Sequence, residues 1–284
     1  MLVPMKPMLE AARASGYAVG AFEFWSLDSA QAVVEAAESL GVPVILQVGT
    51  FEIGYAGLTA LTRIARGVAD QAAAEVALHL DHGDTLELAR ATIDAGFTSV
   101  MIDASHLPYA ENVELTRKVV EIASPHGVSV ESELGRLAGT ESAASVSEEE
   151  AAQTDPQKAE RFVRETGIDA LAVAIGTAHG FYAYVPRLNL DRLARIAGRV
   201  PIPLVLHGGS GTPDDQVRRA IALGISKVNI CTEFVAAFGR AYTNAQQQLG
   251  FRYSVPSLFA AGKAAAKDLA LSKLRLLSGQ AHSP

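Results

Sequence analysis

The stretch VALHLDHG, residues 76–83, shows the pattern that decides the fold. It begins as a short apolar run and ends in polar residues and glycine. Residues 85–94 then follow with helical spacing, between Asp84 and Gly96. An Asp before such a stretch and a Gly behind it are typical helix start and stop signals. A strand followed directly by a helix is a βα unit, which is typical of parallel sheets.

The same unit recurs along the chain. Branched apolar runs that we predict as strands lie at residues 18–22, 43–48, 76–80, 99–102, 128–133, 170–174, 203–206 and 227–230. Helical stretches lie between them, such as 29–40, for which Asp28 is the expected N-cap. These eight units predict an α/β fold, the (β/α)8 TIM barrel. A doubly wound sheet would instead carry a glycine-rich turn after its first strand, where this chain has Phe22-Glu23-Phe24-Trp25.

Two segments interrupt this pattern. Residues 135–154, which follow the fifth strand, are small, polar and acidic, and are too weakly apolar for a core element. A loop of this length is typically a lid over a site or a solvated insertion. Residues 255–277 lie beyond the eighth unit and carry leucines among Ala and Lys, which predicts an extra helix. We expect residues 1–284 to form a single barrel domain with a C-terminal helical extension at 255–277.

The composition excludes several classes of protein. Hydrophobic residues make up 49% of the 284 residues, enough for a large core. The net charge of −7 and the 6% of aromatic residues argue against a nucleic-acid partner. No run approaches the roughly 20 apolar residues that cross a membrane. The lone Cys231 and a start without the apolar core of a secretion signal predict a cytoplasmic protein.

Histidines collect where the active site of a barrel is expected, at the carboxyl ends of the strands. His82, His179 and His207 follow three different strands. A single such histidine is more often a hydrogen-bonded pocket residue, but three converging imidazoles suit a catalytic Zn²⁺ with an open position. Asp81 could exchange a proton with a substrate hydroxyl, or it could orient a ligand histidine.

A phosphate site is indicated after the last two strands. The turn Gly208-Gly209-Ser210-Gly211 and the polar stretch from Asn229 to Thr232, which opens a helix, can present backbone N–H groups to an anion. Cys231 is expected to be a lining residue. Lys227 shares strand parity with Asn229 and could form a Schiff base, but the histidines argue against that chemistry.

Six motifs follow one another in the order of a known family: HLDHG, SVMIDASHLP, VSVESELG, LAVAIGTAHG, PLVLHGGSG and KVNICTE. Together they resemble the class II, metal-dependent fructose- and tagatose-bisphosphate aldolases, with the tagatose-type branch nearest. The resemblance implies reversible cleavage of a ketose bisphosphate to dihydroxyacetone phosphate and an aldehyde. It also implies a homodimer or homotetramer.

The resemblance assigns roles by position. The three histidines would hold Zn²⁺, and Asp103 and Glu133 would belong to a second metal position. Asp81 would take the C4 hydroxyl proton, and Glu141, which arrives as the long loop closes, would exchange the proton on the carbon next to the carbonyl. A monovalent cation near the phosphate is also usual. The residues that would hold dihydroxyacetone phosphate are Gly180, Gly208, Gly209, Ser210, Asn229 and Thr232, with Asn229 also counted as catalytic.

Departures from the family concern the far end of the substrate. Glu23 stands where the family has Asn. At the end of the second strand, where the family has Ser or Thr, this chain has Gly49, followed by Thr50. A carboxylate there would repel a second phosphate, which leaves a ketose 1-phosphate as the alternative substrate. Arg252 lies near the family's phosphate-binding Arg of a neighbouring subunit and argues for the bisphosphate.

Two other classes of function stay open on the sequence. A metal-dependent hydrolase could use the same three histidines to activate water. A binding subunit without activity is disfavoured because metal-ligating and proton-transfer residues occur together.

Overall fold

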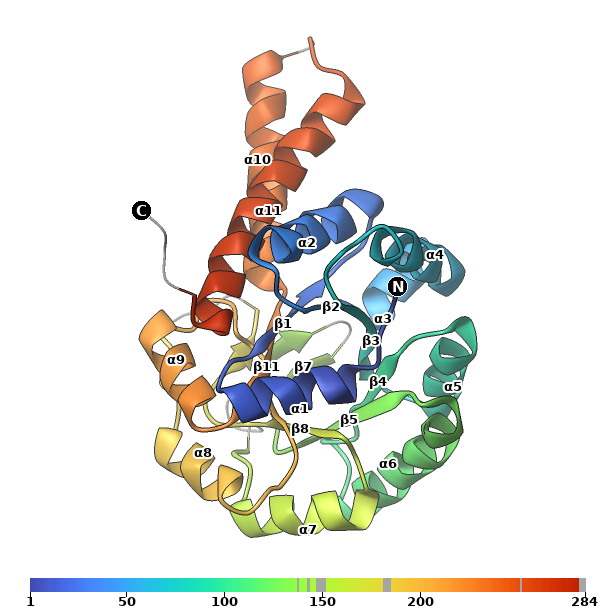
Figure 1. Cartoon of the computed structure of the whole chain (residues 1–284), viewed down its shortest axis with the longest axis vertical. Helices are drawn as coiled ribbons and strands as arrows, with labels where there is room; N and C mark the ends of the chain where they lie inside the picture. The colour runs from blue at the N-terminus through green and yellow to red at the C-terminus, as the bar shows by residue number, and fades with distance from the viewer. Residues whose placement is uncertain (137, 142–143, 147–151, 181–184, 251, 281–284) are drawn as a thin grey trace.

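The computed structural model describes residues 1–136, 138–141, 144–146, 152–180, 185–250 and 252–280 (Figure 1). Of residues 138–141 and 144–146 and of His179 it describes the backbone and not the side chain. Among the described residues, no helix has the length and apolar character needed to cross a membrane.

Eight parallel strands close into a barrel, in the order β1-β11-β10-β8-β5-β4-β3-β2 (Figure 1). Their bounds are β1 Val19–Glu23, β2 Val44–Val48, β3 Val76–Gly83, β4 Ser99–Ile102, β5 Ser129–Leu134, β8 Ala170–Val173, β10 Leu204–Leu206 and β11 Ile225–Ile230. Each overlaps a predicted run, so the (β/α)8 prediction is confirmed. Side chains of both strand faces are buried, as expected where helices cover the outside of a parallel sheet.

Helices surround the barrel (Figure 1). Their bounds are α1 Met5–Ser15, α2 Leu27–Leu40, α3 Thr50–Ala56, α4 Leu58–Ala69, α5 Leu86–Ala95, α6 Tyr109–Ala123, α7 Pro156–Thr166, α8 Leu190–Ala197, α9 Asp214–Ala222, α10 Thr232–Leu249 and α11 Val255–Ser278, with a 3₁₀ turn η1 at Ser124–His126. The start of α2 differs from the expectation. Ser26, not Asp28, is the N-cap, because Ser26 and Ser29 satisfy each other's backbone N–H groups in a capping box.

Helix α1 covers one end of the barrel. Its buried residues Met5, Met8 and Leu9 join a cluster with barrel-lining side chains such as Ile45 and Val205. This apolar cluster fills the end at which the strands begin. The polar side chains of the strands are therefore left to the opposite end.

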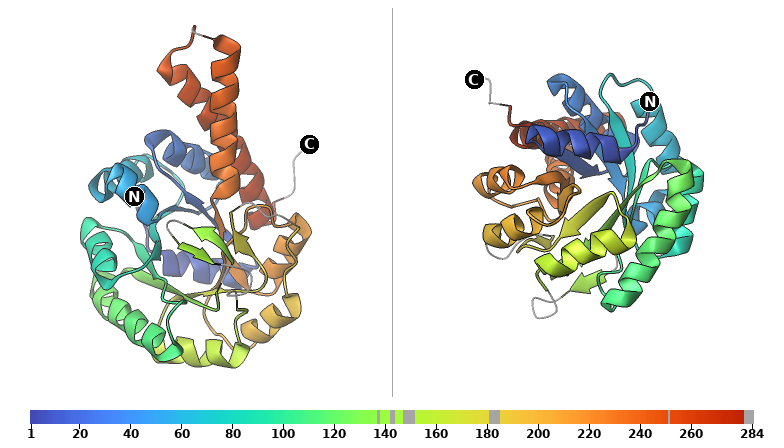
Figure 2. Two further views of the ribbon diagram at one scale, coloured as in Figure 1. Left: turned by 180° about the vertical axis from the view of Figure 1, so that it is seen from behind. Right: turned by 60° about the horizontal axis from the view of Figure 1, so that its bottom comes forward.

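The segment after β5 is not a plain loop. It holds β6 Ala138–Glu141 and β7 Ala144–Val146, which pair antiparallel, while β6 also pairs with β9 Ala178–His179. The segment was predicted as a long loop outside the core, and the structure adds these short strands within it, which depend on pairing rather than on an apolar pattern. Seen from behind, the small sheet lies in front of the barrel, at the end away from α1 (Figure 2, left).

The predicted C-terminal helix is present. Helix α11 packs along α10 and α2, and its buried residues include Leu258, Leu274 and Leu277. The Leu277 carbonyl accepts a 3.0 Å hydrogen bond from the Ala18 N–H, just before β1. The far ends of α10 and α11 project from the barrel as an arm (Figure 1).

Candidate active site

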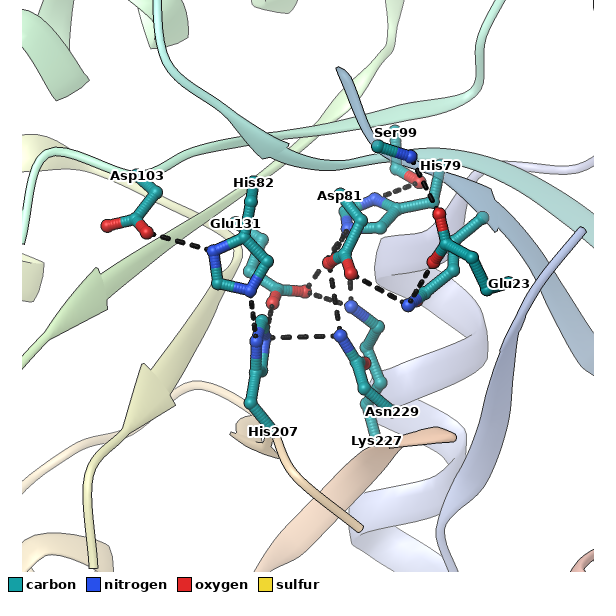
Figure 3. Close-up of polar contacts among 12 residues, drawn as sticks. Glu23, His79, Asp81, His82, Ser99, Asp103, Glu131, His207, Lys227 and Asn229 are labelled. Carbon is teal, nitrogen blue, oxygen red and sulfur yellow. Dashed lines mark hydrogen bonds and ion pairs between the residues drawn. The ribbon is translucent and has the colours of Figure 1, made fainter. Parts of the chain in front are cut away.

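Two of the predicted metal ligands meet at the polar end of the barrel. His82 Nε2 lies 2.7 Å from His207 Nδ1, and the ring centroids are 4.7 Å apart (Figure 3). The two rings come from β3 and from the turn after β10. The expectation that imidazoles distant in sequence converge is confirmed for this pair, whereas the side chain of His179 lies outside the described part of the chain.

An irregular end to β3 makes this meeting possible. Side chains alternate between the two faces of a strand, so Asp81 and His82 would normally point in opposite directions. The pairing of β3 with β4 shifts between Leu80 and Gly83, and His82 has a φ of 43°. Among the described residues it is the only non-glycine residue with positive φ. This uncommon backbone conformation brings both side chains to one centre.

The outer nitrogens of the two imidazoles are bonded to carboxylates. His82 Nδ1 lies 2.8 Å from Asp103 Oδ2, and His207 Nε2 lies 2.9 Å from Glu131 Oε1. A carboxylate accepts, so these outer nitrogens carry the hydrogens and the two facing nitrogens of neutral rings carry lone pairs. Burial lowers the pKa of His207, which favours its neutral ring. Two lone pairs that face each other form a donor set suited to a divalent cation.

Carboxylates complete two candidate metal groups. Asp81, His82 and His207 form one, and His82, Asp103 and Glu133 form the other; within each group the donor atoms lie within 4.8 Å of one another. Burial alone would raise the pKa of Asp103, but the hydrogen bond and charge of His82 lower it overall. The residues present therefore fit Zn²⁺, which takes imidazole and carboxylate ligands.

Asp81 is buried beside the imidazole pair and is fixed by two amides. Asn229 Nδ2 donates to Asp81 Oδ1 at 3.0 Å, and Gln47 Nε2 donates to Asp81 Oδ2 at 2.8 Å. Both carboxylate oxygens are thus oriented toward the site. This geometry suits a group that must accept a proton from a fixed direction. The sequence pointed to Asp81 and Asn229 but gave no signal for Gln47.

A buried ion network holds His207 through Glu131. This network was not predicted from the sequence. Lys227 Nζ lies 2.7 Å from Glu131 Oε2 and 3.2 Å from His79 Nε2, and all three side chains are fully buried. Burial alone would raise the pKa of Glu131, but Lys227 lowers it overall; burial and Lys227 both lower the pKa of His79. Because Lys227 is held in an ion pair, it does not present a free amine for a Schiff base. The available signal for Glu131 was its strand parity with Glu133.

The glycine-rich turn lies against the start of α10, as predicted for a phosphate site. The Gly211 N–H donates to Glu233 Oε1 at 2.7 Å, and Ser210 Oγ accepts from the Glu233 N–H at 3.2 Å. Gly208 has a φ of 65°, and a Cβ there would lie 2.4 Å from the carbonyl oxygen of Ala178. The turn therefore needs glycine at this position.

The other expected phosphate contacts are placed as follows. The Gly209 N–H donates to the carbonyl of Asn229 at 3.0 Å, and this hydrogen bond joins the turn to β11. Thr232 is the first residue of α10, and Gly180 directly follows β9. Arg252 is exposed at the tip of the arm. Since the 18 residues of α10 span about 27 Å, the structure does not bring Arg252 to the site of its own chain.

Glu141 lies at the end of β6 in the small sheet, and its side chain is outside the described part.

A cavity of about 270 Å³ opens next to the imidazole pair, on the side of β1 and β2. The residues that line this distal cavity are Glu23, Gly49, Phe51, Glu52, Asp81, His82 and Cys231.

Comparison with known proteins gives a consistent result. The family model of class II fructose-bisphosphate aldolase matches residues 3–282. The crystal structure of the YdjI aldolase from Escherichia coli K12 has 33% identity and a TM-score of 0.87, covering 99% of this chain and 100% of that chain. A putative fructose-1,6-bisphosphate aldolase from Coccidioides immitis has 29% identity and a TM-score of 0.86, with 96% of each chain covered.

A third structure supports the fold alone. The fructose-bisphosphate aldolase of Campylobacter jejuni has 21% identity and a TM-score of 0.82, covering 96% of this chain and 93% of that chain. The family resemblance expected from the motifs is therefore confirmed over nearly the whole chain.

Proposed function

Because this chain belongs to the class II fructose-bisphosphate aldolase family and is thus an aldehyde-lyase, we propose that it cleaves a phosphorylated ketose reversibly to dihydroxyacetone phosphate and an aldehyde. One observation carries the proposal. The two facing imidazole nitrogens lie 2.7 Å apart, beside a buried carboxylate that belongs to the same group of candidate ligands. A Lewis acid that stabilises the electron pair left on carbon, together with a group that accepts the hydroxyl proton, can break a C–C bond next to a hydroxyl.

His82 and His207, with His179 as the third expected ligand, would hold the catalytic Zn²⁺, and Asp103 and Glu133 would serve a second position. Bound there, the cation supplies electrostatic stabilisation of the negative charge that develops on the dihydroxyacetone phosphate half. Glu131 and Asp103 hold the outer nitrogens of the two imidazoles. They thereby fix the orientation of each ring.

Asp81 is the proposed proton acceptor in the cleavage direction. It takes the proton of the C4 hydroxyl, the C4 oxygen becomes a carbonyl, and the electron pair of the C3–C4 bond remains on C3. Asn229 and Gln47 hold its carboxylate in place through this step. Glu141 is proposed to return a proton to C3, which completes dihydroxyacetone phosphate.

The phosphate of this half is proposed to bind the turn from Gly208 to Gly211 and the start of α10. Ser210, Thr232 and Gly180 are the further expected contacts, and a monovalent cation near the phosphate belongs to the proposal. Support comes from the turn itself, whose Gly211 N–H already holds a carboxylate oxygen. A phosphate oxygen presents the same kind of acceptor.

A panel of ketose phosphates tests the proposal. The purified protein is incubated with fructose and tagatose 1,6-bisphosphates and with the two ketose 1-phosphates, and dihydroxyacetone phosphate is measured by coupled reduction. We expect its release from at least one ketose and the reverse condensation with an aldehyde. Release of inorganic phosphate alone would contradict the proposal and would indicate the hydrolase.

We also propose an oligomeric state and a cellular location for the enzyme. A homodimer or homotetramer is supported by the exposed apolar residues Leu249 and Val255 on the α10–α11 arm. A cytoplasmic location is supported by the single Cys231, which rules out an intrachain disulfide. Light scattering coupled to gel filtration measures the oligomeric state, and a monomeric mass would contradict the proposed oligomer.

A further inference from the structure

We propose that Glu23 and Glu52 make the distal cavity an anionic subsite, which accepts a neutral polyhydroxylated aldehyde half and rejects a phosphorylated one. The inference rests on the proposed function and names its substrate class: a ketose 1-phosphate rather than a bisphosphate.

The position of the cavity assigns it to the aldehyde half. Asp81 and His82 form one of its walls, and the remaining lining residues come from the ends of β1 and β2, the start of α3 and Cys231. No residue of the turn from Gly208 to Gly211 lines it. With the first phosphate on that turn and the C4 hydroxyl at Asp81, the chain beyond C4 extends into this cavity.

The two carboxylates converge on one backbone N–H. Glu23 is 5% exposed, and its Oε1 accepts from the Gly49 N–H at 2.7 Å. Glu52 Oε2 accepts from the same N–H at 3.1 Å. An N–H that opens a helix usually attracts an external anion. Here that N–H is already taken by the protein's own carboxylates.

Glu23 uses both oxygens as acceptors. Its Oε2 accepts from Gln47 Nε2 at 3.1 Å, and the same amide nitrogen donates to Asp81 Oδ2. Both donors are N–H groups, so Glu23 acts only as an acceptor in these two bonds. Gln47 thus joins the subsite to the proposed proton acceptor and keeps the two acids close together.

The charge of the residues that line the distal cavity determines which aldehyde half it accepts. Three carboxylates, Glu23, Glu52 and Asp81, face the cavity, and none of the described residues that line it is Lys or Arg. A phosphate dianion would be repelled by all three at short range in a partly buried site. Sugar hydroxyls donate hydrogen bonds, so they can bind the same carboxylate oxygens.

The test compares kcat/KM for fructose 1-phosphate and fructose 1,6-bisphosphate in wild type, Glu23→Gln and Glu52→Gln. We expect wild type to prefer the 1-phosphate. Each variant should lower the ratio of 1-phosphate to bisphosphate about tenfold, mainly through KM for the bisphosphate, because it removes one negative charge without changing the size of the side chain. Glu114→Gln, on the outer surface of α6, is the matched control and should leave the ratio unchanged.

The outcomes separate the inference from its premise. A wild-type preference for the bisphosphate, or a ratio unchanged in both variants, overturns the inference and leaves aldol cleavage standing. Absence of dihydroxyacetone phosphate from every ketose phosphate contradicts the proposed function, and the inference with it. Thermal unfolding of each variant shows that it is folded; if Glu23→Gln is not, the half-buried Glu52→Gln decides the result alone.

Discussion

Asp81 and His82 are neighbours in sequence that work on the same centre. One is the proposed proton acceptor and the other a proposed metal ligand. The positive φ of His82 and the shifted pairing of β3 let them share the site. Such strained backbone persists only where the surrounding structure holds it, and it collects at functional sites.

Asp81→Asn should separate proton transfer from metal binding. The amide keeps the size of the side chain and can still bond Gln47 or Asn229, but it cannot accept the hydroxyl proton. We expect kcat to fall about 10²- to 10⁴-fold while the metal content stays at the wild-type level. Steady-state kinetics and elemental analysis measure the two quantities. Asp84→Asn, exposed just beyond β3, is the control, and an unchanged kcat for Asp81→Asn would contradict the assigned role.

Lys227→Met should be strongly destabilising. It leaves the buried carboxylate of Glu131 without its ammonium partner, and breaking a buried ion pair from one side costs about 3–5 kcal/mol. Denaturant unfolding measures this loss. Lys227→Met/Glu131→Gln, which also removes the buried negative charge, should recover much of it.

The same lysine distinguishes the two types of aldolase. Borohydride treatment of wild type in the presence of substrate should leave no covalent adduct, because Lys227 is held in an ion pair. A reduced adduct on Lys227 would show a Schiff base and would contradict the metal mechanism.

At the scale of the elements, the sequence predicts what local pattern determines. All eight barrel strands follow from short apolar runs, and the meeting of His82 with His207 follows from the rule that barrel strand ends converge. The strands β6, β7 and β9 could not be predicted, because β6 finds its partner β9 about forty residues further on. The link between Glu131 and Lys227 spans 96 residues and was missed for the same reason.

Gly208→Ala should damage the turn that is proposed to hold the phosphate. An added Cβ would meet backbone at 2.4 Å at a φ of 65°, so the turn must shift. We expect KM for a ketose phosphate to rise at least about tenfold. Gly41→Ala is the matched control, since Gly41 has a φ of 63° and nothing within 4 Å of its Cβ position. It should cost about 1 kcal/mol of stability and leave KM unchanged; equal KM values for the two variants would contradict the role of the turn.

At the scale of the whole molecule, helices from both ends of the described chain pack against the barrel. Helix α1 fills the end where the strands begin, and α11 packs beside β1 (Figure 2, right). The opposite end keeps the polar side chains. We propose that the barrel and the extension at 255–277 unfold together as one domain.

Leu274→Ala tests this unity. Leu274 is 2% exposed, and its Cδ2 lies 3.1 Å from the position of a Cβ on Gly20 in β1. Truncating a buried leucine costs about 2–5 kcal/mol, so we expect a single unfolding transition at lower temperature. Val255→Ala, 60% exposed, should change little. Two separate calorimetric transitions would show that the extension unfolds on its own.

The central claim is that the converging imidazoles hold a divalent cation on which cleavage depends. The most direct measurement is elemental analysis of the purified protein together with its dihydroxyacetone phosphate release, before and after dialysis against a chelator and after addition of Zn²⁺. We predict that metal and activity are lost together, that Zn²⁺ restores both, and that His207→Ala regains neither. Cleavage at the full rate in metal-free protein would contradict the claim.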